Sequence, residues 1–229
     1  MVEQKNCFFS VMVKDFLNAD TAFLMEKMSI GFQWYREVYR GREEYPSSSQ
    51  MESWRDCFDV LREALAEAKE STDWLVFEYC LPQEGGRRPD VLLINSESVV
   101  ILEFKRKGMP ALAQDVDQTA AYLIDLKECH GMSHDLVVES YLVLTKEPSN
   151  IKEKILYKEV TVVSRSMLRN VLKDRASAPE IDILSWLQAP YEPSITILEA
   201  NHRVMEGEEL PEIRRAKSIG INEKLKKLE

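Results

Sequence analysis

Three charged residues interrupt apolar segments in the middle of the chain. Asp90 precedes the apolar segment VLLI, whereas Glu103 and Lys105 end the segment VVILEFK. Residues i and i+2 of a β-strand face the same side, so Glu103 and Lys105 should point in one direction. Asp90, at the start of the adjacent antiparallel strand, can come close to that pair. The pattern predicts two carboxylates and one ammonium group at one end of a β-hairpin.

This set of groups suits phosphodiester hydrolysis that depends on a divalent cation. Carboxylates hold Mg²⁺ or Mn²⁺, which polarises a phosphate and lowers the pKa of an attacking water. A lysine can orient that water or stabilise the developing charge. Glu103 should be buried, which favours its neutral form, and a cation shared with Asp90 would keep both carboxylates ionised. The alternative is an ion pair of Lys105 with Glu103 or Asp90 and no metal, because short motif matches are common.

A further acidic residue, Glu78, lies inside the apolar segment WLVFEYCL. A charge in such a segment needs either a partner or a metal ion. We expect Glu78 to be the third acidic residue of the site, with Glu63 or Glu67 on the preceding helix as the alternatives. A salt bridge from Glu78 to Arg87 or Arg88 is the explanation that needs no metal.

The net charge of -9 argues against broad, non-specific affinity for nucleic acid. A local basic strip can nevertheless lie on an acidic protein and bind phosphate. We expect nucleic-acid contacts from the basic residues clustered in this part of the chain, which are Arg87, Arg88, Lys105, Arg106 and Lys107.

The hydrophobic periodicity predicts the elements that position these residues, with an antiparallel meander of three strands followed by a helix at the centre. The predicted helices lie within 15–28, over 54–69 with Ser53 as the cap, over 111–129, from 164 or 166 to 173 and over 194–206. The predicted strands are 74–81, 91–94, 99–104, 137–145 and 160–164. This order of elements is typical of an α/β fold with a mixed sheet.

The length and composition bound the class of protein. A chain of 229 residues can hold one domain with appendages. Its cysteines form no CxxC pair, which argues against a zinc ribbon or a disulfide framework. There is no apolar run of bilayer length and no signal pattern, so we expect a cytoplasmic protein without a membrane partner. His130 and His134 have the spacing of metal ligands on a helix, but the neighbouring Gly131 and Ser133 favour a surface or capping role.

Three motifs together resemble the PD-(D/E)XK nuclease superfamily. They are PD at 89–90, ExK at 103–105 and QxxxY at 118–122. The resemblance implies a restriction-endonuclease-like core of order α-β-β-β-α-β, with a mixed sheet flanked by helices and with extra N- and C-terminal helices. Over roughly 54–220 the chain is also similar to the N-terminal domain of uncharacterised bacterial DNA/RNA helicase-like proteins with a Schlafen-type ATPase half. The chain has no GxxxxGK[ST] loop, so we expect no ATPase activity from it.

The resemblance also implies roles for individual residues. Asp90 and Glu103 would hold Mg²⁺ or Mn²⁺, with Glu78 as the favoured third acidic ligand. Lys105 would orient the water or stabilise charge. The residues implied to support the site or to contact the phosphate backbone are Gln118 and Tyr122.

These patterns lead to a first hypothesis, a metal-dependent endo- or exonuclease that acts on nucleic acid, with DNA favoured. The alternative is a non-cleaving nucleic-acid-binding or regulatory module that serves an attached helicase or ATPase. A homodimer is a further option, because several such nucleases act as dimers. We expect a helical lead-in over 1–50, the nuclease-like domain over 51–190 and a helical extension or linker over 191–229.

Overall fold

The computed structural model describes residues 6–82, 86–147, 150–173 and 178–192. Its helices are α1 (Val13–Asn18), α2 (Thr21–Arg40), α3 (Ser48–Ala64), α4 (Ala113–Cys129), α5 (Arg165–Lys173) and α6 (Ile183–Leu187), with a short 3₁₀ helix η1 (Leu156–Lys158). Its strands are β1 (Phe9–Met12), β2 (Trp74–Phe77), β3 (Val91–Ile94), β4 (Ser98–Lys105), β5 (Val137–Leu144), β6 (Lys152–Ile155) and β7 (Val160–Ser164).

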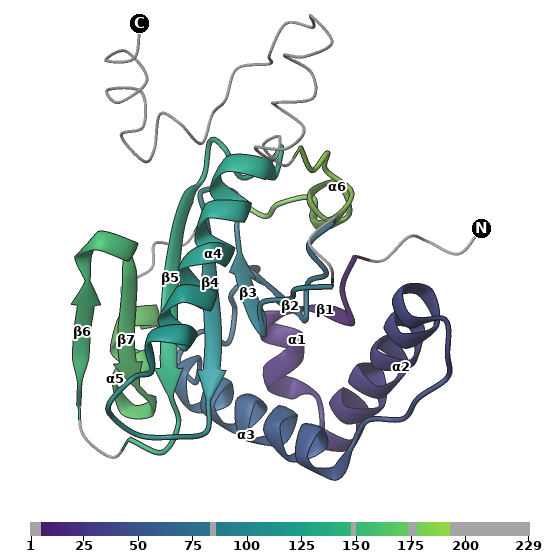
Figure 1. Ribbon diagram of the computed structural model, residues 1–229, viewed down its shortest axis with the longest axis horizontal. Coiled ribbons are helices and arrows are strands. Elements are labelled where there is room, and N and C mark those ends of the chain that lie inside the picture. Colours follow the sequence, from purple (N-terminus) through teal and green to yellow (C-terminus); the bar gives the residue numbers. More distant parts are fainter. Residues whose placement is uncertain (1–5, 83–85, 148–149, 174–177, 193–229) are drawn as a thin grey trace, which may run out of the picture.

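In the described part of the chain, the strands form one seven-stranded mixed sheet of order β1-β2-β3-β4-β5-β7-β6 (Figure 1). Strands β1 to β4 pair antiparallel, β4 pairs parallel with β5, β5 pairs parallel with β7, and β6 returns antiparallel. The parallel pairing of β4 with β5 requires a crossover, which α4 supplies. The predicted meander and the predicted α/β class with a mixed sheet and flanking helices are both confirmed.

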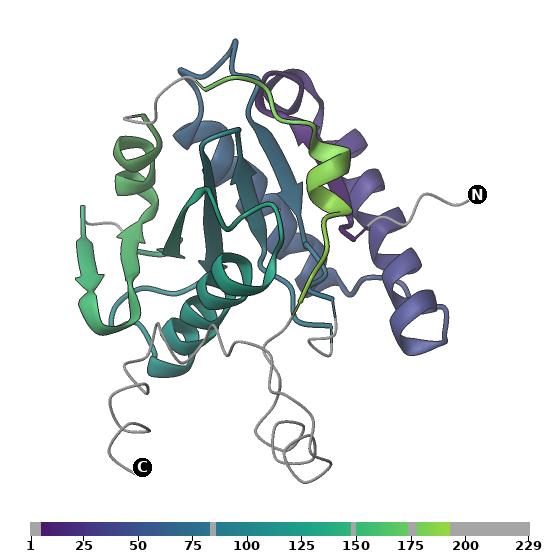
Figure 2. The same ribbon diagram turned by 90° about the horizontal axis from the view of Figure 1, so that it is seen from above.

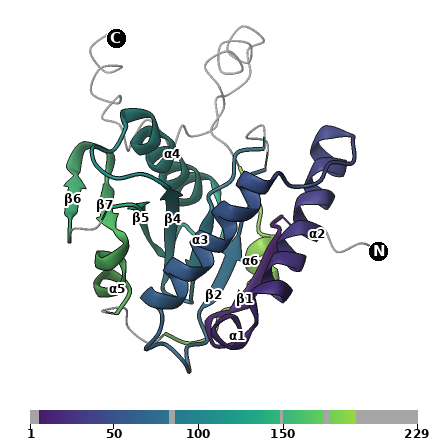
Figure 3. The same ribbon diagram turned by 90° about the horizontal axis from the view of Figure 1, so that it is seen from below.

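Helices cover both faces of this sheet. Views from above and below place α3 and α4 on opposite faces (Figures 2 and 3). On β4, Val100 and Leu102 pack into the core shared with α1, α2, α3 and α5, whereas Ile101 packs into the core shared with α4 and α6. Glu103 and Lys105 continue the series of Ile101, since side chains alternate along a strand. Both therefore lie on the α4 side of the sheet.

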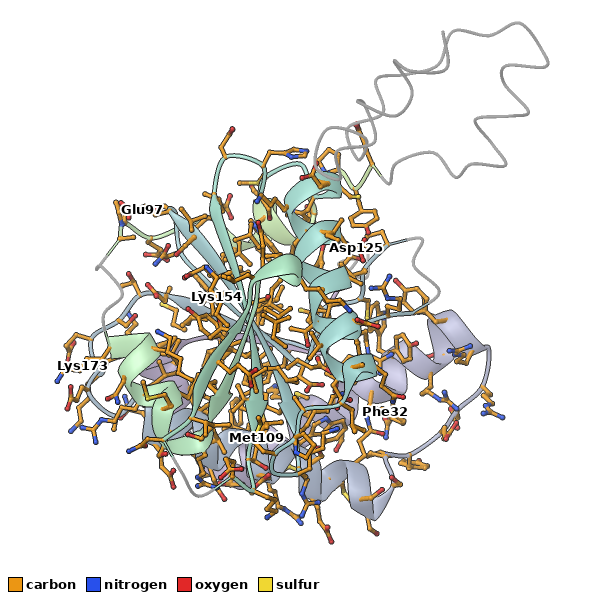
Figure 4. All side chains as sticks on the ribbon, turned by 60° about the vertical axis from the view of Figure 1, so that its left-hand side comes forward. Phe32, Glu97, Met109, Asp125, Lys154 and Lys173 are labelled. Atoms are coloured by element: carbon orange, nitrogen blue, oxygen red, sulfur yellow. The ribbon has the colours of Figure 1, made fainter. Side chains whose placement is uncertain are left out.

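The two cores lie in the interior of the protein, and charged side chains lie at its periphery. Side chains fill the space on each face of the sheet, while Glu97 and Lys173 lie at the outside (Figure 4). None of the described helices combines the length and the apolar character that a bilayer span requires.

The first described residues belong to the same core as the sheet. Strand β1 extends the sheet beside β2, and α1 and α2 contribute to the core that α3 covers. The sequence predicted helices in this region but not β1, because four half-buried residues at a sheet edge carry little periodic signal. Strand β6 was missed for a similar reason, since its sequence KEKI is largely charged and exposed.

Helix α3 begins earlier than predicted. Ser47, and not Ser53, is its N-cap, and the Ser47 hydroxyl accepts a hydrogen bond of 3.2 Å from the Gln50 amide. The prediction of Ser53 as the cap was wrong, because the serines that follow Pro46 offer a hydroxyl closer to the loop. For α5 the sequence left Ser164 and Ser166 as possible caps, and Ser164 is the one that accepts from the Met167 amide, at 3.2 Å. The predicted helix over 194–206 lies outside the described residues.

Gly31 of α2 lies where this helix closely approaches the start of the sheet. A Cβ atom at this position would lie 2.4 Å from the Cα and carbonyl oxygen of Phe8. The obstacle is backbone, which a rotamer change cannot relieve, so α2 needs glycine here for packing and not for its φ angle.

We predict that Gly31→Ala lowers the free energy of unfolding by about 2 kcal/mol or more, because the added methyl group must push α2 away from Phe8. Urea denaturation at constant m-value measures this. Gln33→Ala, on an exposed position of the same helix, is the control and should change stability little. A loss below about 0.5 kcal/mol for Gly31→Ala would contradict the proposed close packing.

Candidate active site

Asp90 and Glu103 meet where the β3–β4 hairpin ends. The register pairs Val91 with Leu102, so the next residues out, Asp90 and Glu103, face each other across the two strands. Asp90 Oδ2 accepts a hydrogen bond of 2.8 Å from the Phe104 amide, and the Asp90 amide lies 3.4 Å from Glu103 Oε2. Backbone pairing thus places the two carboxylates side by side, as the sequence predicted.

Lys105 connects this carboxylate pair to α4. Its Nζ donates to Glu103 Oε1 at 2.8 Å and to Gln118 Oε1 at 3.2 Å. Gln118 Nε2 in turn donates to the Tyr122 hydroxyl at 2.8 Å. The hydrogen-bonded chain Glu103–Lys105–Gln118–Tyr122 therefore links the ExK and QxxxY motifs. Sequence reasoning brought these four residues together correctly.

A third carboxylate near the lysine was not predicted. Asp115, on the first turn of α4, is buried, and its Oδ1 lies 3.9 Å from Lys105 Nζ. Its Oδ2 also pairs with Lys107. The signal was available, because Asp115 lies three positions before Gln118 and shares its helix face.

Burial shifts the ionisation of the carboxylate pair. It raises the pKa of Asp90 well above the usual range, and the charges of Glu103 and Glu78 add to the rise, while the Phe104 amide and Lys105 oppose it. Burial also raises the pKa of Glu103 despite the opposing effect of Lys105. Together these shifts mean that the half-buried Asp90 and the buried Glu103 share too little positive charge.

The ammonium group of Lys105 responds in the opposite way. Burial alone would lower its pKa, but the charge and hydrogen bond of Glu103, with Asp90 and Asp115, outweigh burial and raise it. Lys105 is therefore a charged donor and not a candidate general base.

Glu78 lies at the junction of β2 with the turn that leads to β3. Its φ angle of 51° is in the left-handed region, which ends β2 at Phe77 instead of at the predicted Leu81. Its buried carboxylate accepts from Trp54 Nε1 at 3.2 Å and from Arg88 Nε at 2.8 Å. The salt bridge to Arg88 that the sequence offered as the alternative is present.

The other acidic alternatives lie away from this site. Glu63 pairs with Arg165, and Glu67 pairs with Arg169 and Lys173, so both face α5. Neither lines the cavity that contains Asp90 and Glu103. This placement removes Glu63 and Glu67 as candidates for the third acidic residue.

The predicted basic residues are already paired with protein groups. Arg87 lies 3.2 Å from Asp125 and its guanidinium stacks over the Tyr122 ring, 5.3 Å from the centroid. Arg88 stacks over the Tyr35 ring at 4.1 Å in addition to its bond with Glu78. Arg106 pairs with Glu52 at 3.2 Å, and Lys107 pairs with Asp115. Phosphate binding by any of these residues would compete with an existing ion pair.

One cavity contains the predicted site. It has a volume of about 530 Å³ and spans the end of the sheet between α3 and α4. Arg106 and Lys107 do not line it. Its lining includes the predicted residues Glu78, Arg87, Arg88, Asp90, Glu103, Lys105, Gln118 and Tyr122. It also includes polar residues of the α3 N-terminus that sequence reasoning missed, namely Ser47, Ser49, Gln50 and Ser53.

The histidines are separate from this site. His130 is fully buried beside Trp186, its Nδ1 lies 2.8 Å from the Ser133 hydroxyl, and burial lowers its pKa to about 4. It follows the last residue of α4, which agrees with a capping position but not with a surface one. His134 is exposed. Neither histidine lines the cavity described above.

The donor set can be compared with what a divalent cation needs. Within the described residues, no group of three or more His, Cys, Asp or Glu side chains is arranged to hold a metal ion. Both oxygens of Glu78 are engaged by Trp54 and Arg88. Both oxygens of Glu103 are also engaged, by Lys105 and by the Asp90 amide, so a cation shared by Asp90 and Glu103 would have to replace one of these hydrogen bonds. Two carboxylates suit Mg²⁺, which commonly binds one or two carboxylates and completes its shell with water and substrate phosphate. They do not suit a structural zinc site.

Known proteins provide no further assignment. No protein-family model matches the chain, and no curated protein or solved structure is significantly similar to it.

The shifted pKa values predict how Asp90 affects stability. The folded state holds a proton on Asp90 more tightly than the unfolded chain does, so the ionised carboxylate destabilises the fold above about pH 4, the ordinary aspartate pKa. Without divalent cations, Asp90→Asn should raise the melting temperature near neutral pH. The gain should shrink as the pH falls towards about 4.

Thermal unfolding in a chelating buffer at several pH values measures this difference. Asp135→Asn, at an exposed position, is the matched control and should show no such pH-dependent gain. If Asp90→Asn is less stable than the wild type at neutral pH, then the carboxylate is a stabilising structural group and the electrostatic description is wrong.

Proposed function

We propose that the chain is a Mg²⁺- or Mn²⁺-dependent nuclease of the PD-(D/E)XK type, with a restriction-endonuclease-like core. The observation that carries the proposal is the convergence of Asp90, Glu103 and Lys105 at the end of one hairpin, with Gln118 of α4 bonded to the lysine. An isolated structural ion pair would need neither a second, half-buried carboxylate nor an amide from another element. The order α3-β2-β3-β4-α4-β5 supports the proposal, because it is the order the superfamily resemblance implies.

In this proposal Asp90 and Glu103 hold the cation, which supplies Lewis-acid activation of the phosphate and of a water molecule. Lys105, held by Glu103 and Gln118, donates a hydrogen bond towards the oxygen that gains charge in the transition state. Gln118 fixes the lysine, and the buried Tyr122 fixes Gln118. The hydroxyl groups of the α3 N-terminus form the opposite wall of the cavity.

Glu78 has a supporting role in this account. Its oxygens hold Trp54 of α3 and Arg88 of the turn before β3, so it ties together two walls of the cavity. Its left-handed backbone costs free energy of order 1 kcal/mol, and such strain is common where a side chain must reach a site.

A second candidate function is a non-cleaving regulatory module of the same fold. The observation in its favour is that the predicted phosphate-binding cations already have carboxylate partners, on a protein of net charge -9. This arrangement also favours weak binding of substrate over tight, non-specific binding of nucleic acid. DNA, RNA and an attached helicase are the partners proposed for these two functions.

The proposal predicts that Asp90→Asn and Lys105→Ala each reduce the rate of nucleic-acid cleavage at least about 100-fold, because each removes a group needed for charge stabilisation. Cleavage of single- and double-stranded DNA and RNA with Mg²⁺ or Mn²⁺ is the assay. Glu63→Gln, on the α5-facing side of α3, is the control and should cut at the wild-type rate. Wild-type protein that cuts none of these substrates, or folded variants that cut as fast as the wild type, would contradict the nuclease and favour the regulatory module.

Glu78 should behave differently from the proposed metal ligands. We predict that Glu78→Gln lowers the cleavage rate about tenfold, since it weakens the support of the site without removing a ligand. The affinity for Mn²⁺ should stay within a few-fold of the wild type. A loss of Mn²⁺ affinity as large as that of Asp90→Asn would show instead that Glu78 is a ligand.

A further inference from the structure

Four apolar residues form a stripe along the exposed side of α2, and we call them the α2 stripe. They are Phe23, Ile30, Trp34 and Val38. The intervals of seven, four and four positions are close to whole helical turns, so the side chains lie on one side of the helix. Phe23, Ile30 and Val38 are 42%, 53% and 60% exposed. Trp34 is half-buried.

This stripe flanks the face that α2 packs into the core: Trp34 packs partly against that core, and the Phe23 ring meets Phe9 of β1 edge-on, whereas Ile30 and Val38 are mostly exposed. The core face carries Leu24, Met28, Phe32 and Tyr35, all of which are buried. Both faces are therefore apolar, which is more than a helix on a protein surface needs. Contiguous exposed apolar side chains of this kind mark interaction sites.

The charges beside the stripe indicate the orientation of the partner. Lys27, whose Nζ lies 5.1 Å from the centre of the Phe23 ring, belongs to the N-terminal half of α2. Glu37, which is exposed, belongs to the C-terminal half. A second α2 in antiparallel orientation brings each lysine towards the glutamate of the other copy, whereas a parallel one brings lysine towards lysine.

The positions of these residues are also consistent with two-fold symmetry. The midpoint of Lys27 and Glu37 is position 32, and the midpoint of Ile30 and Trp34 is the same position. An axis at this level therefore brings Ile30 of one copy towards Trp34 of the other while it aligns both charge pairs. Such self-complementarity is what an isologous interface requires.

We propose that the α2 stripe is a homodimer interface in which α2 of one copy packs antiparallel against α2 of a second copy. A helix of 20 residues is about 30 Å long, so the contact is at the small end of specific interfaces, and the dimer dissociates in the micromolar range. Tyr35, which donates to the Gly86 carbonyl at 3.3 Å, lies on the core face. Dimerisation therefore leaves the contacts between α2 and the candidate active site in place.

Sedimentation velocity on the full chain, over about 1 to 200 µM, tests the interface. The wild type should shift from monomer to dimer, and Ile30→Glu should raise the dissociation constant at least about 100-fold, because it would bury two charges without partners, one from each copy, near the two-fold axis. Val137→Glu changes an apolar residue that is 63% exposed on β5 and should dimerise like the wild type. A wild type that is monomeric throughout overturns the proposal, and the occupant of the stripe would then be residues 193–229 or a different protein. So does a dimer that persists in Ile30→Glu.

Charge reversal tests the antiparallel orientation separately. Lys27→Glu and Glu37→Lys should each weaken the dimer about tenfold, because each places like charges together at two symmetric positions. The double variant should recover the wild-type dissociation constant. Circular dichroism melts confirm that each variant is folded, which these exposed or half-buried positions allow. A double variant as weak as the product of the single effects would overturn the antiparallel arrangement.

Discussion

The Phe104 amide donates a hydrogen bond of 2.8 Å to Asp90, and the candidate site depends on this contact. It extends the β3–β4 pairing by one step beyond Val91 and Leu102, using a side chain in place of a carbonyl. As a result Asp90 is held against β4 on the side where Glu103 emerges. Lys105 follows two positions later and faces α4. Because side chains alternate along β4, this one strand places the Glu103 carboxylate and the Lys105 ammonium group in the cavity. The Asp90 carboxylate reaches the same cavity from the start of β3.

The carboxylates of this cluster outnumber the cations beside them, and this imbalance suggests a chemical role. Asp90, Glu103 and Glu78 are close enough to influence one another, and the nearby cations are Lys105 and Arg88. Arg88 is bound by Glu78, so Lys105 is left with two carboxylates and with Asp115 at a greater distance. A fold under selection for stability alone would gain by neutralising one carboxylate. A divalent cation between Asp90 and Glu103 would correct the imbalance and would leave room for a phosphate.

Much of the fold followed from the sequence because its signals are local. The apolar runs at 91–94 and 99–104 and the periodic helix at 113–129 were placed within about two residues. The i and i+2 rule then predicted the grouping of Glu103 with Lys105, and helical spacing predicted that of Gln118 with Tyr122. Strands β1 and β6 were not predicted, because edge strands need little hydrophobic alternation.

The surroundings of the site could not be predicted in the same way. The contacts of Glu78 depend on its left-handed backbone and on Trp54 of a distant helix, and neither can be recognised from the local sequence. The pairing of Arg106 with Glu52 likewise depends on how α3 crosses the sheet. A cluster of basic residues in the sequence therefore looked like a binding strip, although in the fold its members are neutralised by carboxylates brought from elsewhere.

The central claim is that Asp90 and Glu103 form a cation site. Calorimetric titration of the wild type and of Asp90→Asn with Mn²⁺ tests it most directly, because it needs no knowledge of the substrate. We expect one binding event in the wild type that is lost in folded Asp90→Asn and retained in Glu63→Gln. Absence of Mn²⁺ binding in the wild type, or equal binding in Asp90→Asn, would contradict it.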